Sequence, residues 1–140
     1  MTARLAVVLL LAALPMCGDG EEEVTKVVST LAGALTANNP ELFLKSMDHN
    51  MPDYRKLEQD VDALSRYTEI GCTIEVISTA GNAASQTADL DWYMALKSQQ
   101  DENLVERRRT KVTIKIEKRG KKWIVTSFSP ISVFAPLVAR

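Results

Sequence analysis

The chain has 140 residues, and 46% of them are hydrophobic, which is enough to build the core of one ordinary domain. Its 17 Lys and Arg residues nearly balance its 18 Asp and Glu residues. Because this balance creates no overall field, the composition argues against nucleic-acid binding and against attachment to an anionic membrane by charge alone.

The first twenty residues are predicted to be a targeting leader. Arg4 supplies an early positive charge, and residues 5–14 form an uninterrupted run of Leu, Ala and Val. This pattern is typical of a secretory signal peptide, and the run is too short for a stable membrane span, which needs about 20 apolar residues. We therefore expect an exported protein, periplasmic or anchored by lipid, with one folded domain over residues 21–140.

Cys17 follows the apolar run, and a Cys at this place resembles the lipobox of bacterial lipoproteins, in which that Cys is lipidated. Met16 departs from the small residue that usually precedes such a Cys. The alternative is ordinary cleavage after Gly18 or Gly20, with Cys17 discarded. Either way Cys72 is the one remaining thiol, so no internal disulfide is expected, and its apolar neighbours predict a buried, inert side chain.

A long amphipathic helix is predicted over residues 21–37. It opens with three acidic residues, which favour a helix N-terminus, and Asn38, Asn39 and Pro40 should end it. Apolar residues at helical spacing share one face, namely Val24, Val27, Val28, Leu31 and Leu35.

Two shorter helices should follow. Asn39 as N-cap and Pro40 at the first position start a helix that runs to about Met47 and buries Leu42 and Phe43. Residues 52 and 53 start the other. Its apolar face carries Tyr54, Leu57, Val61 and Leu64.

From Ile70 onward apolar residues recur at every second position, which predicts a change from helix to sheet. Turns at residues 81–82 and a polar loop at 98–103 separate three long strands, and the last strand ends at Pro130. Arg119–Gly120 is predicted as a two-residue hairpin turn that sets Trp123 and Val125 across from Ile116 and Ile114. The apolar tail after Pro130 should pack on the domain.

These elements predict an α+β fold in which three N-terminal helices pack in a strongly bent antiparallel sheet of about four strands. The element order, together with the last strand over residues 121–130, resembles the nuclear-transport-factor-2-like or SnoaL-like superfamily, which includes ketosteroid isomerase. The resemblance covers about residues 21–134. It implies a cone whose open end holds a ligand or an active site, and dimerisation through the outer sheet face.

No catalytic set can be carried over from that resemblance. The isomerase reaction needs an Asp base and a Tyr donor inside an apolar cavity. Asp89 and Asp91 alternate onto the strand face opposite Trp92 and Met94, which directs both carboxylates out of the cone. The remaining candidates for an isomerase-like or dehydratase-like enzyme, the rival to a protein without catalysis, are Asp48, His49 and Tyr54.

Binding residues are expected where large side chains face the cone. These candidates are Tyr54, Trp92, Met94, Arg108, Trp123 and Phe128, and the alternative for the apolar members is plain core. Arg108 shares the parity of Val112 and Ile114, so its guanidinium could bind an anionic group at the cavity rim. The alternative for Arg108 is an ion pair with Glu106 or with a helix acid.

The opposite face of the sheet is expected to be charged. Asp89 and Asp91 should lie in register with basic residues of the next strand, namely Arg107, Arg109 and Lys111. This face is either a solvated, ion-paired surface or a homodimer interface with Tyr93, Arg107 and Arg109 as contacts.

The leading prediction is an exported, non-enzymatic binding or accessory domain that holds a small apolar or anionic ligand or a protein partner. The alternatives are the enzyme at the cone mouth and a dimeric structural lipoprotein that acts through the outer sheet face. The sequence predicts no metal site, because no convergent set of His, Cys and acidic residues is visible, and it predicts no cofactor.

Overall fold

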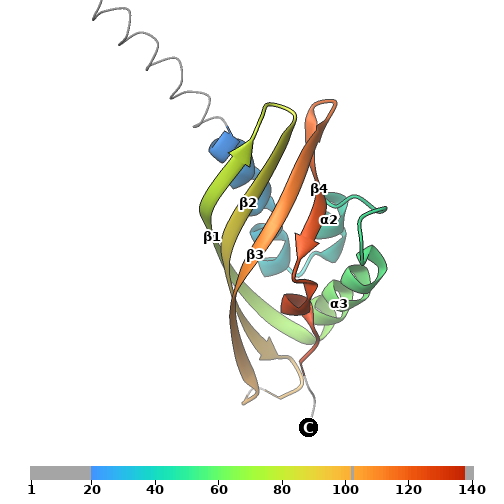
Figure 1. Cartoon of the computed structure of the whole chain (residues 1–140). Coiled ribbons are helices and arrows are strands. Elements are labelled where there is room, and N and C mark those ends of the chain that lie inside the picture. Colours follow the sequence, from blue (N-terminus) through green and yellow to red (C-terminus); the bar gives the residue numbers. More distant parts are fainter. Residues whose placement is uncertain (1–19, 102, 138–140) are drawn as a thin grey trace, which may run out of the picture.

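The computed structural model describes residues 20–101 and 103–137. The predicted leader and Cys17 lie outside these residues, so their roles stay predictions. In Figure 1 a curved sheet lies against an N-terminal helix, and two further helices flank its last strand.

The N-terminal helix is described over residues 20–36, and its apolar stripe packs into the core as predicted. Asn38 ends it in the left-handed region with φ 54°, where Asn is tolerated better than most residues. The Asn38 side chain also donates to the carbonyls of Ser65 and Thr68, both at 2.7 Å. The end of this helix is therefore joined to the place where the third helix becomes the first strand.

Helix α2, Pro40–Lys45, begins as predicted, because the Asn39 side chain accepts a hydrogen bond from Leu42 N–H at 3.1 Å. Phe43 is fully buried, but the prediction that Leu42 is buried too was wrong, since 41% of it is exposed. Adjacent residues of a helix lie about 100° apart, so a six-residue helix that buries Phe43 directs Leu42 outward. Helix α3, Tyr54–Tyr67, buries Leu57, Val61 and Leu64 along one face.

The sheet has four antiparallel strands in the order of the sequence: β1, Thr68–Gly81; β2, Ser85–Ser98; β3, Val105–Arg119; and β4, Lys122–Ser129. Strand β1 follows α3 directly and curves away from it to the far edge of the sheet (Figure 1). A short 3-10 helix, η1, Ile131–Phe134, follows β4. The α+β class, the three helices and the bent four-stranded sheet are as predicted.

The register of the last hairpin differs from the prediction. Arg119 pairs with Lys122, so the two-residue loop is Gly120–Lys121, with Gly120 at φ 65°. Trp123 therefore faces Lys118, and Ile116 faces Val125. A bulge at Thr126 then shifts the parity of the strand, which lets Val125 and Phe128 both point into the core.

The core fills the space between the inner face of the sheet and the helices. Its fully buried large side chains come from the N-terminal helix, α2, α3, β2, β3 and η1. They include Leu31, Leu35, Phe43, Leu57, Trp92, Met94, Ile114, Ile116 and Phe134.

Candidate functional site

The loop between α2 and α3 is attached to the outer edge of β4. The Val125 N–H donates to the Ser46 carbonyl at 2.8 Å, and the Asp48 N–H donates to the Val125 carbonyl at 2.8 Å. Met47 and Val125 thereby form a parallel bridge. This attachment places the predicted candidates Asp48 and His49 beside the edge of the sheet.

Asp48 is held by two donors. Its carboxylate accepts a hydrogen bond from the Asn50 N–H at 2.8 Å and one from Arg119 Nη2 at 2.7 Å. These bonds, the backbone one first, hold the pKa of Asp48 below its ordinary value. A carboxylate with a lowered pKa is a weak base at neutral pH, so this environment suits a structural anion better than a proton acceptor.

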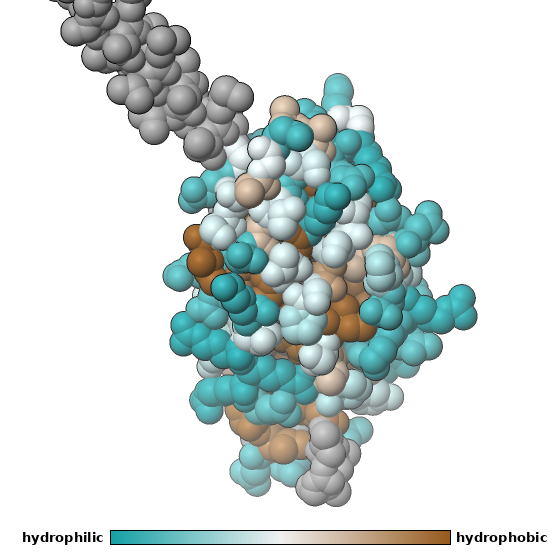
Figure 2. All heavy atoms as spheres, viewed as in Figure 1, coloured by the Kyte–Doolittle hydropathy of each residue, from teal (hydrophilic) through white to brown (hydrophobic). Residues whose placement is uncertain are grey.

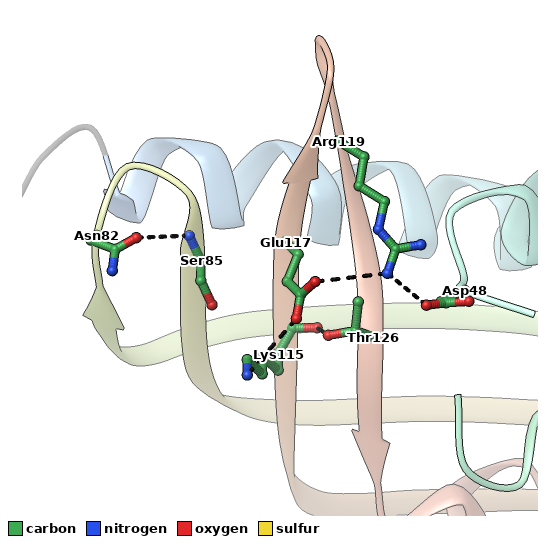
Figure 3. Close-up of polar contacts among 7 residues, drawn as sticks. All are labelled: Asp48, Asn82, Ser85, Lys115, Glu117, Arg119 and Thr126. Carbon is green, nitrogen blue, oxygen red and sulfur yellow. Dashed lines mark hydrogen bonds and ion pairs between the residues drawn. The ribbon is translucent and has the colours of Figure 1, made fainter. Parts of the chain in front are cut away.

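The charges continue from Asp48 along β3. Arg119 Nη2 lies 3.7 Å from Glu117 Oε1, and Glu117 Oε2 lies 3.8 Å from Lys115 Nζ. Figure 3 shows these side chains in a row, with Asp48 reaching the row from its loop. The row alternates in sign and lies on an exposed surface, where each pair contributes little by itself.

The rings of His49 and Tyr54 lie next to each other. Their ring centroids are 4.7 Å apart with the planes tilted by 33°. His49 is exposed and Tyr54 is half-buried, and burial raises the pKa of the Tyr54 hydroxyl, with the nearby Glu58 adding to the effect. The three catalytic candidates thus come from one region of the molecule. The Asp48 carboxylate, however, is hydrogen-bonded to Arg119, and the exposed His49 ring lies against Tyr54.

The inside of the cone is filled by aromatic rings. Trp92 lies edge-to-face against Phe128 and against Phe134, with centroids 5.2 Å and 5.6 Å apart, and Phe43 packs on Phe134 at 5.3 Å. Trp92, Met94 and Phe134 are fully buried. Of the predicted cavity residues, Trp92 and Phe128 therefore pack against Phe134, and Met94 belongs to the same buried core.

Phe134 comes from the C-terminal tail, and Arg108 holds that tail in place. The guanidinium donates from Nη1 to the Val133 carbonyl at 2.8 Å and from Nη2 to the Pro136 carbonyl at 3.4 Å. Its Nε pairs with Glu106 at 2.6 Å, and only 13% of the side chain is exposed. The predicted alternative for Arg108, an ion pair with Glu106, is thus present. Its remaining donors bind carbonyl groups of the C-terminal tail.

The outer face of the sheet carries charged residues, among which Asp91 and Arg109 form an ion pair. Arg109 binds Asp91 with two hydrogen bonds, of 2.7 Å and 3.2 Å, and these bonds lower the pKa of Asp91. Asp89 was predicted to pair with a basic residue, but it accepts hydrogen bonds from Thr113 at 2.9 Å and from Ser78 at 3.3 Å instead. Tyr93 is half-buried on this face.

Figure 2, in the same view as Figure 1, shows mostly teal and white spheres over the strands, with brown limited to smaller patches. This appearance fits a polar outer sheet surface. Arg107 is exposed there beside the Arg109 pair. Whether Tyr93, Arg107 and Arg109 contact a second copy stays a prediction.

A surface groove of about 390 Å³ lies between the N-terminal helix, α2 and the start of β4. Three lysines line it, Lys26, Lys45 and Lys122, with Glu23 as the one acid. Its apolar lining comprises Val27, Leu42, Trp123 and Ile124. We call it the lysine groove.

Of the predicted ligand-binding residues, Trp123 is the one that lines the lysine groove. The groove was not predicted from the sequence, because its lysines come from three separate elements that only the fold brings together. The one local signal for the groove is the adjacent pair Leu42 and Phe43. A short helix cannot bury both of these large apolar side chains, so one of them, Leu42, lies on the surface.

Two further properties concern the described part of the chain only. Residues 20–101 and 103–137 contain no cluster of three or more His, Cys, Asp or Glu side chains placed to hold a metal ion. None of the helices in this part is both long enough and apolar enough to cross a bilayer.

No protein-family model matches the sequence, and no curated protein matches it significantly. Solved structures do match in three dimensions. A conserved protein from Planctomyces limnophilus aligns with a TM-score of 0.69 at 7% identity, over 77% of this chain and 91% of that one. A nuclear transport factor 2-like superfamily protein from Salmonella enterica aligns with a TM-score of 0.62 at 10% identity, over 88% and 95%.

A third match is a candidate scytalone dehydratase from Novosphingobium aromaticivorans, with a TM-score of 0.66 at 9% identity over 77% of this chain and 80% of that one. Identities this low show the fold and leave the activity open. The chain has the nuclear-transport-factor-2-like fold that its element order suggested.

Proposed function

We propose that this chain is an exported binding or accessory domain without catalytic activity, and that it meets a protein partner through its surface. The observation that carries the proposal is the filled cone, in which Phe134 lies against Trp92 and Phe43. A ligand in the cone interior would have to displace these rings. The surface offers an open groove instead.

The same observation weakens the enzyme alternative. An isomerase or dehydratase needs an enclosed, substrate-sized space into which an acid and a base converge. Asp48, His49 and Tyr54 supply titratable groups, but Asp48 is engaged by Arg119 and His49 lies in solvent. The name of the Novosphingobium protein refers to that protein's chemistry, and for this chain a dehydratase remains the second candidate.

Export is the part of the proposal that rests on sequence alone. Arg4 and the apolar run over residues 5–14 support a signal peptide. Cys17 supports a lipid anchor at the start of the mature chain. An anchored domain of this kind would present its surface groove to soluble or membrane partners outside the cytoplasm.

Native mass spectrometry of the protein purified from its own host tests the proposal. We expect the mass of the bare polypeptide, with or without a lipid on Cys17, and no retained small molecule. A stoichiometric apolar ligand that is released on denaturation would overturn the proposal and favour the cone interior as the site. The Phe134→Ala variant serves as the matched control, because its emptied cone should be able to retain an apolar guest.

The outer sheet face remains an alternative surface for self-association. Tyr93 is half-buried beside the Asp91–Arg109 pair and would be the aromatic anchor of a dimer. If the wild type is a dimer by light scattering, Tyr93→Arg should make it a monomer, whereas the exposed α3 substitution Gln59→Arg should not. A dimer that persists in Tyr93→Arg would exclude this face.

A further inference from the structure

The lysine groove combines positive charge, apolar surface and part of the outer edge strand β4. We propose that it binds an extended segment of a partner protein in which carboxylate side chains alternate with apolar ones. The inference rests on the proposed function and specifies the chemistry of the partner.

The charge of the groove differs from that of the chain. The whole sequence has a formal net charge of −1, but the groove is lined by three lysines and one glutamate. Lys26 lies 3.6 Å from Glu23 and 3.8 Å from Glu22, so its charge is partly offset. Among the described residues, Lys45 and Lys122 have no carboxylate within 4.0 Å. These two ammonium groups are available to carboxylates of a partner.

The apolar lining supplies a contact for uncharged side chains between those carboxylates. Leu42 is 41% exposed, and Trp123 is half-buried at the start of β4. Trp is among the residues that most often contribute strongly to protein interfaces. An apolar wall with ammonium groups around it favours a ligand that has both kinds of group over one that is only acidic.

The edge of β4 adds main-chain groups. The N–H and C=O of Val125 both point away from β3, because they bind the Asp48 and Ser46 backbones. Residues two apart on a strand direct these groups to the same side, so the N–H and C=O of Trp123 point to the same outer edge. Trp123 also lines the groove. An extended peptide can pair with this edge in the way the loop after α2 already pairs with Val125.

The shape of the site favours a peptide over a small molecule. A small ligand generally needs a pocket that buries most of its surface. The lysine groove lies on the surface between three elements, which contribute two separate lysines and residues of the edge strand β4. A chain of several residues can reach all of these features at once.

The test uses a fluorescein-labelled peptide of about ten residues in which Asp alternates with Leu, with a Lys–Leu peptide and an Asp–Ser peptide as comparisons. Fluorescence polarisation with the mature full chain should show binding of the Asp–Leu peptide only, and the binding should weaken as salt is raised. Equal binding of the Lys–Leu peptide would overturn the proposal.

Matched variants locate the site. Lys45→Gln/Lys122→Gln should weaken binding of the Asp–Leu peptide about threefold to tenfold, as the loss of two exposed ion pairs implies. Lys97→Gln/Lys111→Gln makes the same change in charge on exposed strand residues outside the groove and should leave the affinity unchanged. Equal losses in both double variants would mean a nonspecific charge effect and would contradict the proposal.

A second readout separates the peptide from other anions. Anionic vesicles of phosphatidylglycerol and phosphatidylcholine should neither bind the chain through Lys45 and Lys122 nor compete with the peptide; if they do, the groove recognises a lipid surface and the proposal fails. Failure of the peptide to bind would not contradict the proposed function, which rests on the filled cone and is tested separately by mass spectrometry. The two proposals can therefore fail independently.

Discussion

Arg119 Nη2 donates a hydrogen bond to Asp48 Oδ2 at 2.7 Å, joining two residues that are 71 positions apart. The bond connects the end of β3 to the loop after α2. It acts beside the two main-chain bonds that fix the same loop to Val125. Asp48 is thus part of a clamp that holds one wall of the lysine groove, including Lys45 and Ser46, against β4.

The clamp predicts a pH dependence of stability. The pKa of Asp48 is lowered in the folded state, mainly by the Asn50 N–H and Arg119, so folding favours its ionised form. This contribution is fully present above the unfolded pKa of about 3.9 and is lost as the pH falls through the lower folded value. Asp48→Asn should therefore melt at a lower temperature than the wild type at pH 7, with the difference shrinking as the pH falls below about 4.

The control for that measurement is Asp62→Asn. Asp62 pairs with Arg66 at 2.9 Å within α3, and both side chains are well exposed, so this variant should melt close to the wild type at pH 7. Thermal melts followed by circular dichroism give both curves. A pH-independent difference for Asp48→Asn would show that its effect does not come from the carboxylate charge.

Phe134→Ala should destabilise the fold strongly. Phe134 is fully buried and touches the rings of Phe43, Trp92 and Phe128, so its removal leaves a cavity in the centre of the core. Buried Phe→Ala changes cost about 3–5 kcal/mol of the free energy of unfolding. Urea titrations should show this loss, and Ser132→Ala, which changes an exposed residue of the same turn, should not.

A second outcome follows for the same variant. An apolar cavity of this kind stays dry and can take a small apolar guest. Benzene or a similar molecule should therefore raise the melting temperature of Phe134→Ala but not that of the wild type. If the wild type is stabilised equally, the cone already holds accessible space, and the basis of the proposed function is lost.

The sequence predicts the elements of this fold well because each has a single clear period. Val24, Val28, Leu31 and Leu35 repeat at helical spacing on a helix that packs on one side, and Val112, Ile114 and Ile116 alternate on a strand whose other face is in solvent. In both segments, burial and local geometry require the same pattern.

The predicted register of the last hairpin was wrong because the residues around its turn show no clear period. Arg119, Lys121 and Lys122 are all polar, so nothing in the pattern fixes which two residues form the loop, and Gly120 fits either choice. The bulge at Thr126 then restores the burial of Phe128 after the parity has changed. A bulge inserts one residue into the strand, so its position cannot be predicted from the alternation of apolar and polar residues.

The candidate site was less predictable than the fold. Trp92, Met94 and Phe128 face inward as their parity requires, but the sequence does not tell whether the space between them is open. Phe134 from the tail fills it, and Arg108 turns to that tail rather than to solvent. Both facts depend on contacts between segments that are about 25 residues or more apart, which periodicity does not encode.

Arg108→Met should loosen the tail. The substitution keeps most of the apolar stem and removes the donors to the Val133 and Pro136 carbonyls. Hydrogen bonds from a charged donor contribute about 1.5–3 kcal/mol, so we expect a loss in this range. Hydrogen exchange of the Val133–Ala135 amides should accelerate relative to amides in the middle of β2.

The matched variant is Arg109→Met, which removes an exposed guanidinium from the next residue of the same strand. Its partner Asp91 lies on the outer sheet face, so the tail amides should keep the wild-type exchange rate. Equal acceleration in both variants would mean that Arg108 does not hold the tail specifically.

Cys72 should be an unreactive thiol in the native protein. It lies in β1 opposite Met94 and packs against the core, and burial raises its pKa to about 12. Because the thiolate is the nucleophile, very little reactive form exists at pH 8. In a Cys17→Ser background, Ellman's reagent should label the native chain slowly and the chain unfolded in guanidinium chloride quickly.

The raised pKa of Cys72 also predicts that stability falls as the pH rises above the unfolded thiol pKa and toward about 12, because only the unfolded chain then releases the proton. Cys72→Ala should lack this component of the alkaline decline, and fast labelling of the native Cys17→Ser chain at pH 8 would show that β1 opens readily at this position.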